Sequence, residues 1–219
     1  MSDPSGSRGR LVLKYLVGAA VLLVLVDRIF PSIPLALLPH ETVALPDPSA
    51  EPVQEESGRA PFREWRRISE FVLTPRATYD ISARVLSTES YWSGPGGALM
   101  PWDFALGWGV AAERDVVRRC SISQFSRFYT LSTHDPSVDV QAVARSSANV
   151  HLVAASGRIE RAFSRVRSGD LVRLEGELVD VAGPDGFAWG TSLTRGDTGP
   201  GACETLYVRS LTVGTRRYR

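Results

Sequence analysis

The sequence has few of the residues from which common metal and nucleophile sites are built. Its 219 residues include only two cysteines and three histidines, and the net charge is +1. Two cysteines are too few for a disulfide-stapled scaffold or a four-cysteine zinc site. A net charge near zero gives no general attraction to nucleic acid. We therefore expect no cofactor, no metal site and no nucleic-acid partner.

The two cysteines leave two interpretations open. Cys120 and Cys203 are a disulfide candidate if the domain lies in an oxidising compartment. The alternative is a pair of free thiols, since cysteine often packs as a small hydrophobic residue.

One long apolar run lies near the N-terminus, at residues 11–30. Lys14 near its start can extend its amine to the membrane interface, so the run is long enough for one membrane crossing. Arg8 and Arg10 precede it, and after Arg28 no Lys or Arg appears until Arg59. The positive-inside rule then predicts a cytoplasmic N-terminus at residues 1–10 and an exported remainder. A cleaved secretory signal is the alternative, and it predicts the same compartment.

Residues 31–61 are rich in proline and acidic side chains. The stretch 46–58 carries four carboxylates and almost nothing to bury. Such a segment cannot offset its ordering entropy, so we expect an extended, mobile linker.

The pattern from residue 62 to residue 219 predicts a domain rich in β-strands. Alternating or buried apolar runs bounded by turn residues predict strands at 79–85, 125–131, 149–155, 170–181, 187–194 and 203–213. Gly176 falls within one of them and indicates a bulge or a sharp bend.

Helical spacing is limited to three short stretches. It predicts helices at 62–71 and 112–120, the second with Cys120 on its apolar face, and most clearly at 159–167, with Gly169 after its end. We expect a mainly β (α+β) fold, a small OB-like β-barrel with one or two short helices preceded by a single transmembrane helix. An open α+β sheet is the alternative.

Several runs, taken together, resemble those of an uncharacterised bacterial family. They are PWDFALGWG, ISQFSRFYT, SANVHLVAAS, GDLVRLEGELVDV and SLTRGDTGPGACETLYV, and the resemblance covers residues 79–211. Members of that family carry an N-terminal membrane segment and a β-rich C-terminal region. The resemblance implies this architecture and no assigned activity.

His151 is the strongest catalytic candidate in the sequence. Strand alternation places it on the same face as Asn149, opposite Val150 and Leu152. A histidine oriented by a neighbour can act as a general base, and Asp103, flanked by aromatic residues, is a candidate acid. The alternative is a structural histidine and a capping aspartate.

Four residues near predicted loops are candidates for binding: Trp102, Trp108, Trp189 and Arg195. Aromatic rings at loops can stack on ligands or anchor a protein partner, whereas the alternative for them is core packing.

These features support two functional hypotheses. The first is a non-catalytic binding or assembly module of the bacterial cell envelope, anchored in the inner membrane and exposed to an envelope protein partner in the periplasm or outside. The second is an envelope hydrolase that uses His151 with Asn149 and Asp103, and it requires these side chains to meet in a pocket.

Overall fold

The computed structural model describes residues 38–63, 71–93, 96–197, 199 and 201–219. The expected membrane segment at 11–30 and most of the helix expected at 62–71 lie outside these residues. Among the described residues, no helix has both the length and the apolar character needed to cross a membrane.

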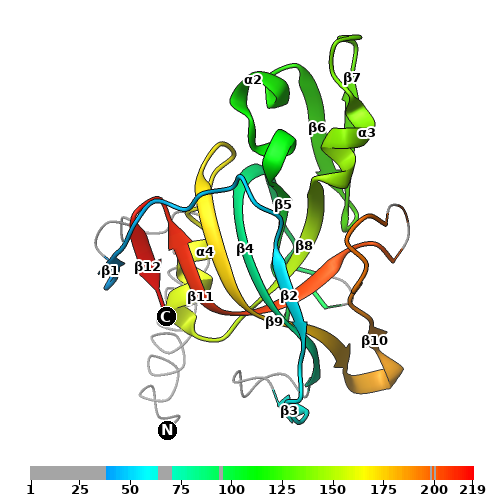
Figure 1. Cartoon of the computed structure of the whole chain (residues 1–219). Coiled ribbons are helices and arrows are strands. Elements are labelled where there is room, and N and C mark those ends of the chain that lie inside the picture. Colours follow the sequence, from blue (N-terminus) through cyan, green and yellow to red (C-terminus); the bar gives the residue numbers. More distant parts are fainter. Residues whose placement is uncertain (1–37, 64–70, 94–95, 198, 200) are drawn as a thin grey trace, which may run out of the picture. The chain divides into compact units, whose positions relative to one another are not determined.

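The fold is mainly β, and five of its strands pair in a closed cycle (Figure 1). The strands, in order around the cycle, are β4 (Val72–Ser90), β5 (Trp102–Gly107), β8 (Ser147–Ala154), β11 (Glu204–Val213) and β9 (Leu171–Ala182). Neighbouring strands run antiparallel, except that β8 and β11 are parallel. The cycle curves the sheet into a partly barrel-like ring.

Strand β8 is buried at all eight of its positions, and it carries both apolar and polar side chains. Leu152 and Val150 on one face are fully buried. On the other face Val153 joins a second hydrophobic cluster with residues of β9 and β11, including Tyr207 and Val181. A strand that is covered on both faces needs side chains that pack against apolar neighbours or pair with polar ones on each face. The polar side chains of β8 belong to the candidate site.

Helix α4 (Gly157–Phe163) connects β8 to β9 and confirms the clearest helix expected from the sequence, although it ends earlier. The Ser156 side chain caps its start by accepting the backbone N–H of Ile159. Phe163 packs edge-to-face on Phe104 of β5, with ring centroids 5.8 Å apart. The helix therefore joins its apolar stripe to the core of the ring.

The irregularity expected at Gly176 lies in the partner strand. Opposite Gly176, the register of β11 shifts between Val208 and Ser210. A Cβ atom at Gly176 would lie 1.9 Å from the backbone oxygen of Tyr207. Glycine is therefore required here because the two backbones approach too closely for any side chain.

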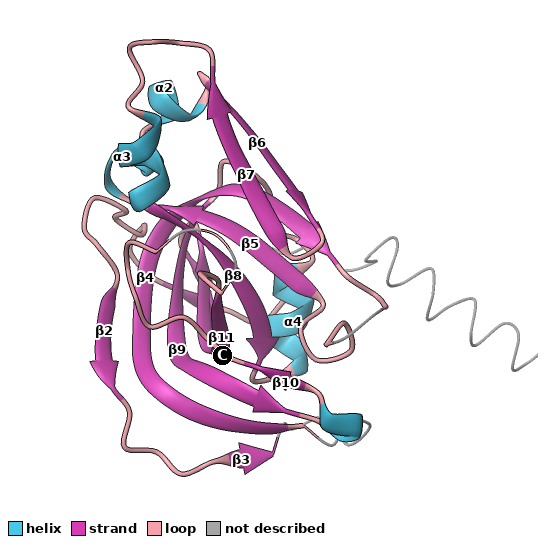
Figure 2. Ribbon diagram, turned by 90° about the vertical axis from the view of Figure 1, so that its right-hand side faces the viewer, coloured by secondary structure: helices cyan, strands magenta, loops and turns pink. Residues whose placement is uncertain are grey.

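The segment between β5 and β8 corrects two expectations. Instead of one helix at 112–120, it contains a 3-10 turn (Gly109–Ala112) and one turn of helix, α2 (Arg114–Val117), and Cys120 begins a strand. Instead of one strand at 125–131, it forms a hairpin of β6 (Cys120–Phe125) and β7 (Phe128–Thr133), followed by α3 (Val140–Arg145). The hairpin, α2 and α3 lie at one end of the ring in both views (Figures 1 and 2).

The second half of the expected linker is part of the sheet. Residues 39–219 form one compact unit, and three short strands precede β4: β1 (Glu41–Thr42), β2 (Val53–Glu56) and β3 (Phe62–Arg63). β2 and β3 pair with β4, and β1 pairs with β12 (Arg216–Tyr218). Val53 remains 59% exposed. Backbone pairing along sheet edges, which side-chain composition does not reveal, therefore orders this segment.

Two further boundaries differ from expectation. The partner strand expected at 187–194 is reduced to β10 (Ala188–Trp189), after a turn at Pro184–Gly186. The strand at Glu204–Val213 is followed by β12, so the basic residues near the C-terminus are partly ordered in the sheet.

Candidate functional site

Asp103 and His151 face each other across two strands. They are directly opposed in the antiparallel ladder between β5 and β8, so their side chains share a face of the sheet. His151 Nδ1 lies 2.9 Å from Asp103 Oδ1, and neither side chain is exposed. The two atoms are close without the alignment of a hydrogen bond. Asp103 and His151, two of the three residues named in the hydrolase hypothesis, are therefore neighbours in the fold.

Arg127 completes a buried charged group with this pair. Its Nη1 donates to Asp103 Oδ1 at 2.8 Å and to the backbone oxygen of Met100 at 2.7 Å. The guanidinium carbon lies 4.0 Å from the centre of the Tyr91 ring, and the Tyr91 hydroxyl accepts the backbone N–H of Arg127. Arg127 therefore holds the tip of the β6–β7 hairpin against the ring of strands.

The turn that carries Arg127 has an unusual backbone. Ser126 and Arg127 are the two central residues of the hairpin turn, with φ of 50° and 71°. Turns of this kind favour Asn-Gly, and a non-glycine residue in this region costs on the order of 1 kcal/mol or more. The buried contact between Arg127 and Asp103 offsets that strain. The strained turn is therefore part of what positions Arg127 in the site.

Asn149 links the hairpin to β8. Its Nδ2 donates to the backbone oxygen of Arg127 at 3.0 Å, and its Oδ1 accepts from Gln124 Nε2 at 2.8 Å. The Cys203 thiol lies 3.7 Å from both Asn149 Nδ2 and the Arg127 oxygen. Burial raises the pKa of Cys203 to about 11, so this thiol stays protonated at neutral pH.

The pair of Asp103 and His151 is sealed from solvent. Trp189 of β10 contacts the His151 ring edge-to-face at 5.0 Å between centroids. Neither Asp103 nor His151 lines the pocket described next. A general base must reach its substrate, and here the imidazole is enclosed by neighbouring side chains.

An open pocket of about 290 Å³ lies beside this buried group. We call it the hairpin pocket; its walls are formed by β7, α3 and β8 and by four residues that precede β11, Asp197, Gly199, Ala202 and Cys203. Asn149 and Cys203 connect the buried group to its wall. The other residues that line it are Phe128, Tyr129, Leu131, Gln141, Ala144, Ser147, Ala148, Asp197, Gly199 and Ala202.

Most of these wall residues were not identified from the sequence. Phe128 is 43% exposed, and the Tyr129 hydroxyl lies 2.8 Å from Ser147 Oγ. The sequence signal that could have revealed these residues is the alternation of exposed and half-buried positions in β6 and β7, which is typical of a β-hairpin. The turn between the two strands contains no glycine, proline or asparagine, so the sequence does not show where one strand ends and the next begins.

A buried acid lies near the pocket wall. Glu204 is 4% exposed, and burial raises the pKa of its carboxyl to about 8. Burial, with the nearby charge of Glu204, also raises the pKa of Tyr79. Arg195 donates to the Tyr79 hydroxyl at 2.7 Å and approaches Gln54, so this predicted binding residue anchors its own loop.

The predicted binding tryptophans differ in exposure. Trp108 is only 2% exposed, so it packs in the core, which was the alternative to a binding role. Trp102 is half-buried and packs edge-to-face against Trp92, which is 52% exposed. Trp189 is half-buried over His151.

Cys120 and Cys203 are both free thiols, so the disulfide considered from the sequence is not formed in this structure. Among the described residues, no group of three or more His, Cys, Asp or Glu side chains could hold a metal ion. No family model, curated protein or solved structure matches the chain.

Proposed function

We propose that this protein is a non-catalytic binding module of the cell envelope that receives a protein partner in the hairpin pocket. In this proposal residues 11–30 anchor the chain in the inner membrane, with the N-terminus in the cytoplasm and the β domain outside. The observation that carries the proposal is the placement of the charged group. Asp103 and Arg127 are buried behind the pocket wall, where they fix the hairpin that forms it.

The proposal includes an OB-like barrel as the fold. Five strands pair in a cycle, the third and fifth are parallel, and α4 lies between the third and fourth. Barrels of this type bind ligands on the second and third strands and in the loop before the fifth. The lining of the hairpin pocket includes Asn149 of β8, the third strand, and Asp197 and Cys203 from the loop before β11, the fifth strand.

The wall chemistry favours recognition. Phe128 and Leu131 offer apolar surface for a partner side chain, while Gln141 and Asp197 supply polar groups at the same pocket. Cys203 is the strongest nucleophile on the wall by residue type, and its raised pKa keeps it protonated.

A photo-crosslinking residue at position 128, in the full-length protein in its native membrane, tests the proposal. We expect one discrete crosslinked protein, and we expect it to disappear when excess unmodified protein competes. Val53, exposed on β2 and absent from the pocket lining, is the matched control position. An identical pattern from both positions, or no crosslink from position 128, would refute the proposal.

The 2.9 Å approach of His151 to Asp103 is the one observation that favours the envelope hydrolase. That alternative requires the sealed histidine to be reached by a substrate. Turnover of an ester or peptide substrate that His151→Gln abolishes without a change in melting temperature would establish it in place of the binding module.

A further inference from the structure

A second pocket, of about 390 Å³, lies between β4, α2 and the turn before β9. We call it the arginine pocket; it is lined by Arg84, Val85, Arg114, Val117, Arg118, Ser168 and Gly169. Three of these seven residues are arginines, and none is an aspartate or glutamate. It shares no lining residue with the hairpin pocket.

Arg84 is fixed in this pocket by neutral groups. Its Nε donates to the backbone oxygen of Ala112 at 2.6 Å, and its Nη1 donates to that of Gly169 at 2.9 Å. Backbone carbonyls orient a guanidinium without neutralising its charge. The site is therefore built before any ligand arrives, with its central cation held from two sides.

The arginines lack strong acidic partners. Neither Arg84 nor Arg114 takes part in any ion pair found among the described residues. Arg118 lies 3.9 Å from Asp115, but both side chains are mostly exposed, so that pair contributes little.

One carboxylate lies next to this positive lining but is not part of it. Asp170 follows Gly169 in the chain, and its Oδ2 accepts the backbone N–H of Arg167, which directs the carboxylate without removing its charge. Burial lowers the pKa of Arg84, and the positive charge of Arg114 lowers it further. The two guanidiniums thus repel each other, and an anion placed between them would relieve that repulsion.

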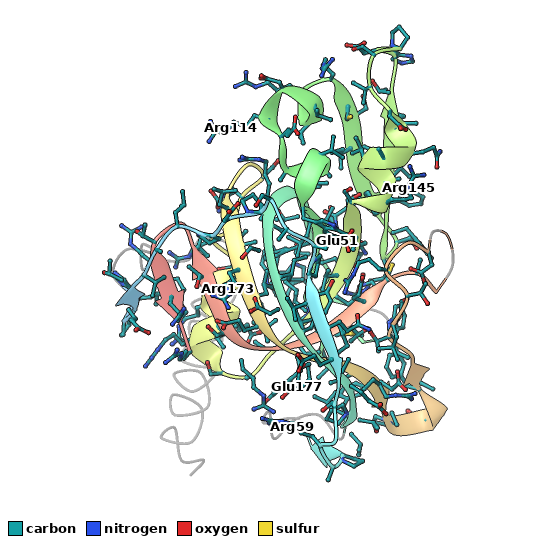
Figure 3. The ribbon with its side chains drawn as sticks, in the orientation of Figure 1. Glu51, Arg59, Arg114, Arg145, Arg173 and Glu177 are labelled. Atoms are coloured by element: carbon teal, nitrogen blue, oxygen red, sulfur yellow. The ribbon has the colours of Figure 1, made fainter. Side chains whose placement is uncertain are left out.

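We propose that the arginine pocket binds a phosphate group, either as a soluble phosphate ester or as the headgroup of a phospholipid. Guanidinium groups bind phosphate through paired N–H donors, and a dianion suits several cations better than a single carboxylate does. The pocket volume lies in the range of small-molecule sites. Figure 3 shows Arg114 at the edge of the molecule, well separated from Arg145.

Titration calorimetry on the full-length protein in a nonionic detergent tests the site. The probes are inorganic phosphate, glycerol 3-phosphate and dihexanoyl phosphatidic acid. We expect saturable binding of at least one probe that weakens as salt is added. Binding of phosphate and glycerol 3-phosphate indicates a soluble ester, and binding of the lipid alone indicates a headgroup.

Arg114→Ala and Arg118→Ala remove exposed side chains and leave the anchored Arg84 in place. Each should weaken binding by about tenfold, the loss expected for one charge-assisted hydrogen bond. Arg145→Ala, at an exposed site on α3 outside this pocket, should leave binding unchanged. Absence of saturable binding by all three probes, or equal binding by wild type and both pocket variants, would overturn the proposal. Neither result bears on the crosslink at position 128.

Discussion

The guanidinium of Arg127 reaches Oδ1 of Asp103 at 2.8 Å from a turn position whose φ is 71°. The two residues come from different parts of the fold, the tip of the β6–β7 hairpin and the start of β5. Their side chains are 11% and 0% exposed. A strained turn and a buried ion pair thus depend on each other, and the wall of the hairpin pocket depends on both.

Removal of the carboxylate should therefore loosen the hairpin. Asp103→Ala leaves the Arg127 charge buried and unpaired, which we expect to cost about 3–5 kcal/mol of unfolding free energy. Urea denaturation measures the loss, and hydrogen exchange should show reduced protection across Cys120–Phe125 and Phe128–Thr133. Glu51→Ala, at an exposed loop position, is the control and should change the unfolding free energy by no more than about 0.5 kcal/mol and leave the hairpin's protection unchanged. Unchanged protection in the hairpin would show that the ion pair does not hold it.

Stability should depend on pH through Glu204. Burial raises the pKa of this carboxyl from its ordinary value to about 8 in the folded protein. Between the two values the unfolded chain has ionised while the folded chain still holds its proton. Stability therefore falls as pH rises towards 8, by up to a few kcal/mol, and changes little above it.

Glu204→Gln should abolish that dependence, because glutamine has no proton to lose. We expect the variant to match wild type at about pH 5 and to exceed its stability at about pH 9 in urea titrations. The exposed Glu51 offers a control, and Glu51→Gln should retain the wild-type profile. Parallel stability profiles for wild type and Glu204→Gln would show that Glu204 titrates normally.

Gly176→Ala should destabilise the ring strongly. The added methyl group would lie 1.9 Å from the Tyr207 backbone oxygen, so β9 and β11 would have to separate. We expect a loss of about 3 kcal/mol, at the upper end of overpacking effects. Gly196→Ala is the matched control, since nothing lies within 4 Å of its added atom. A thermal melt that moves equally for both variants would contradict the close approach.

The two thiols should be countable without a reductant. Full-length protein purified without a reductant and unfolded in denaturant should give two free thiols per chain with a thiol reagent. In the native state, both should react slowly, since burial raises the pKa of Cys120 and of Cys203. Recovery of no free thiol before reduction would mean that the cellular protein carries the disulfide.

The sequence predicts the long elements of the ring better than their connections. β8, β9 and β11 carry sustained apolar or alternating runs, and α4 has both an apolar stripe and a capping serine. The β6–β7 hairpin escapes the same reasoning because Ser126 and Arg127 supply none of the usual turn residues. Apolar residues at helical spacing before Cys120 favour one helix at 112–120, whereas the fold has a 3-10 turn, the short helix α2 and the start of β6 there.

Part of the candidate site could likewise be predicted from the sequence, and part could not. Strand alternation is enough to place His151 and Asn149 on one face, and the opposing register brings Asp103 to His151. Burial under Trp189 and the approach of Arg127 depend on how distant segments fold back. The arginine pocket joins residues of three separate segments, so its convergence cannot be read along the chain.

Strand β11 is the only one of the five ring strands that pairs with both β8 and β9 within the described part of the chain. During synthesis four strands leave the ribosome before the one that joins them. The nascent chain therefore carries unpaired strand edges until β11 emerges, and closure of the ring waits for that strand.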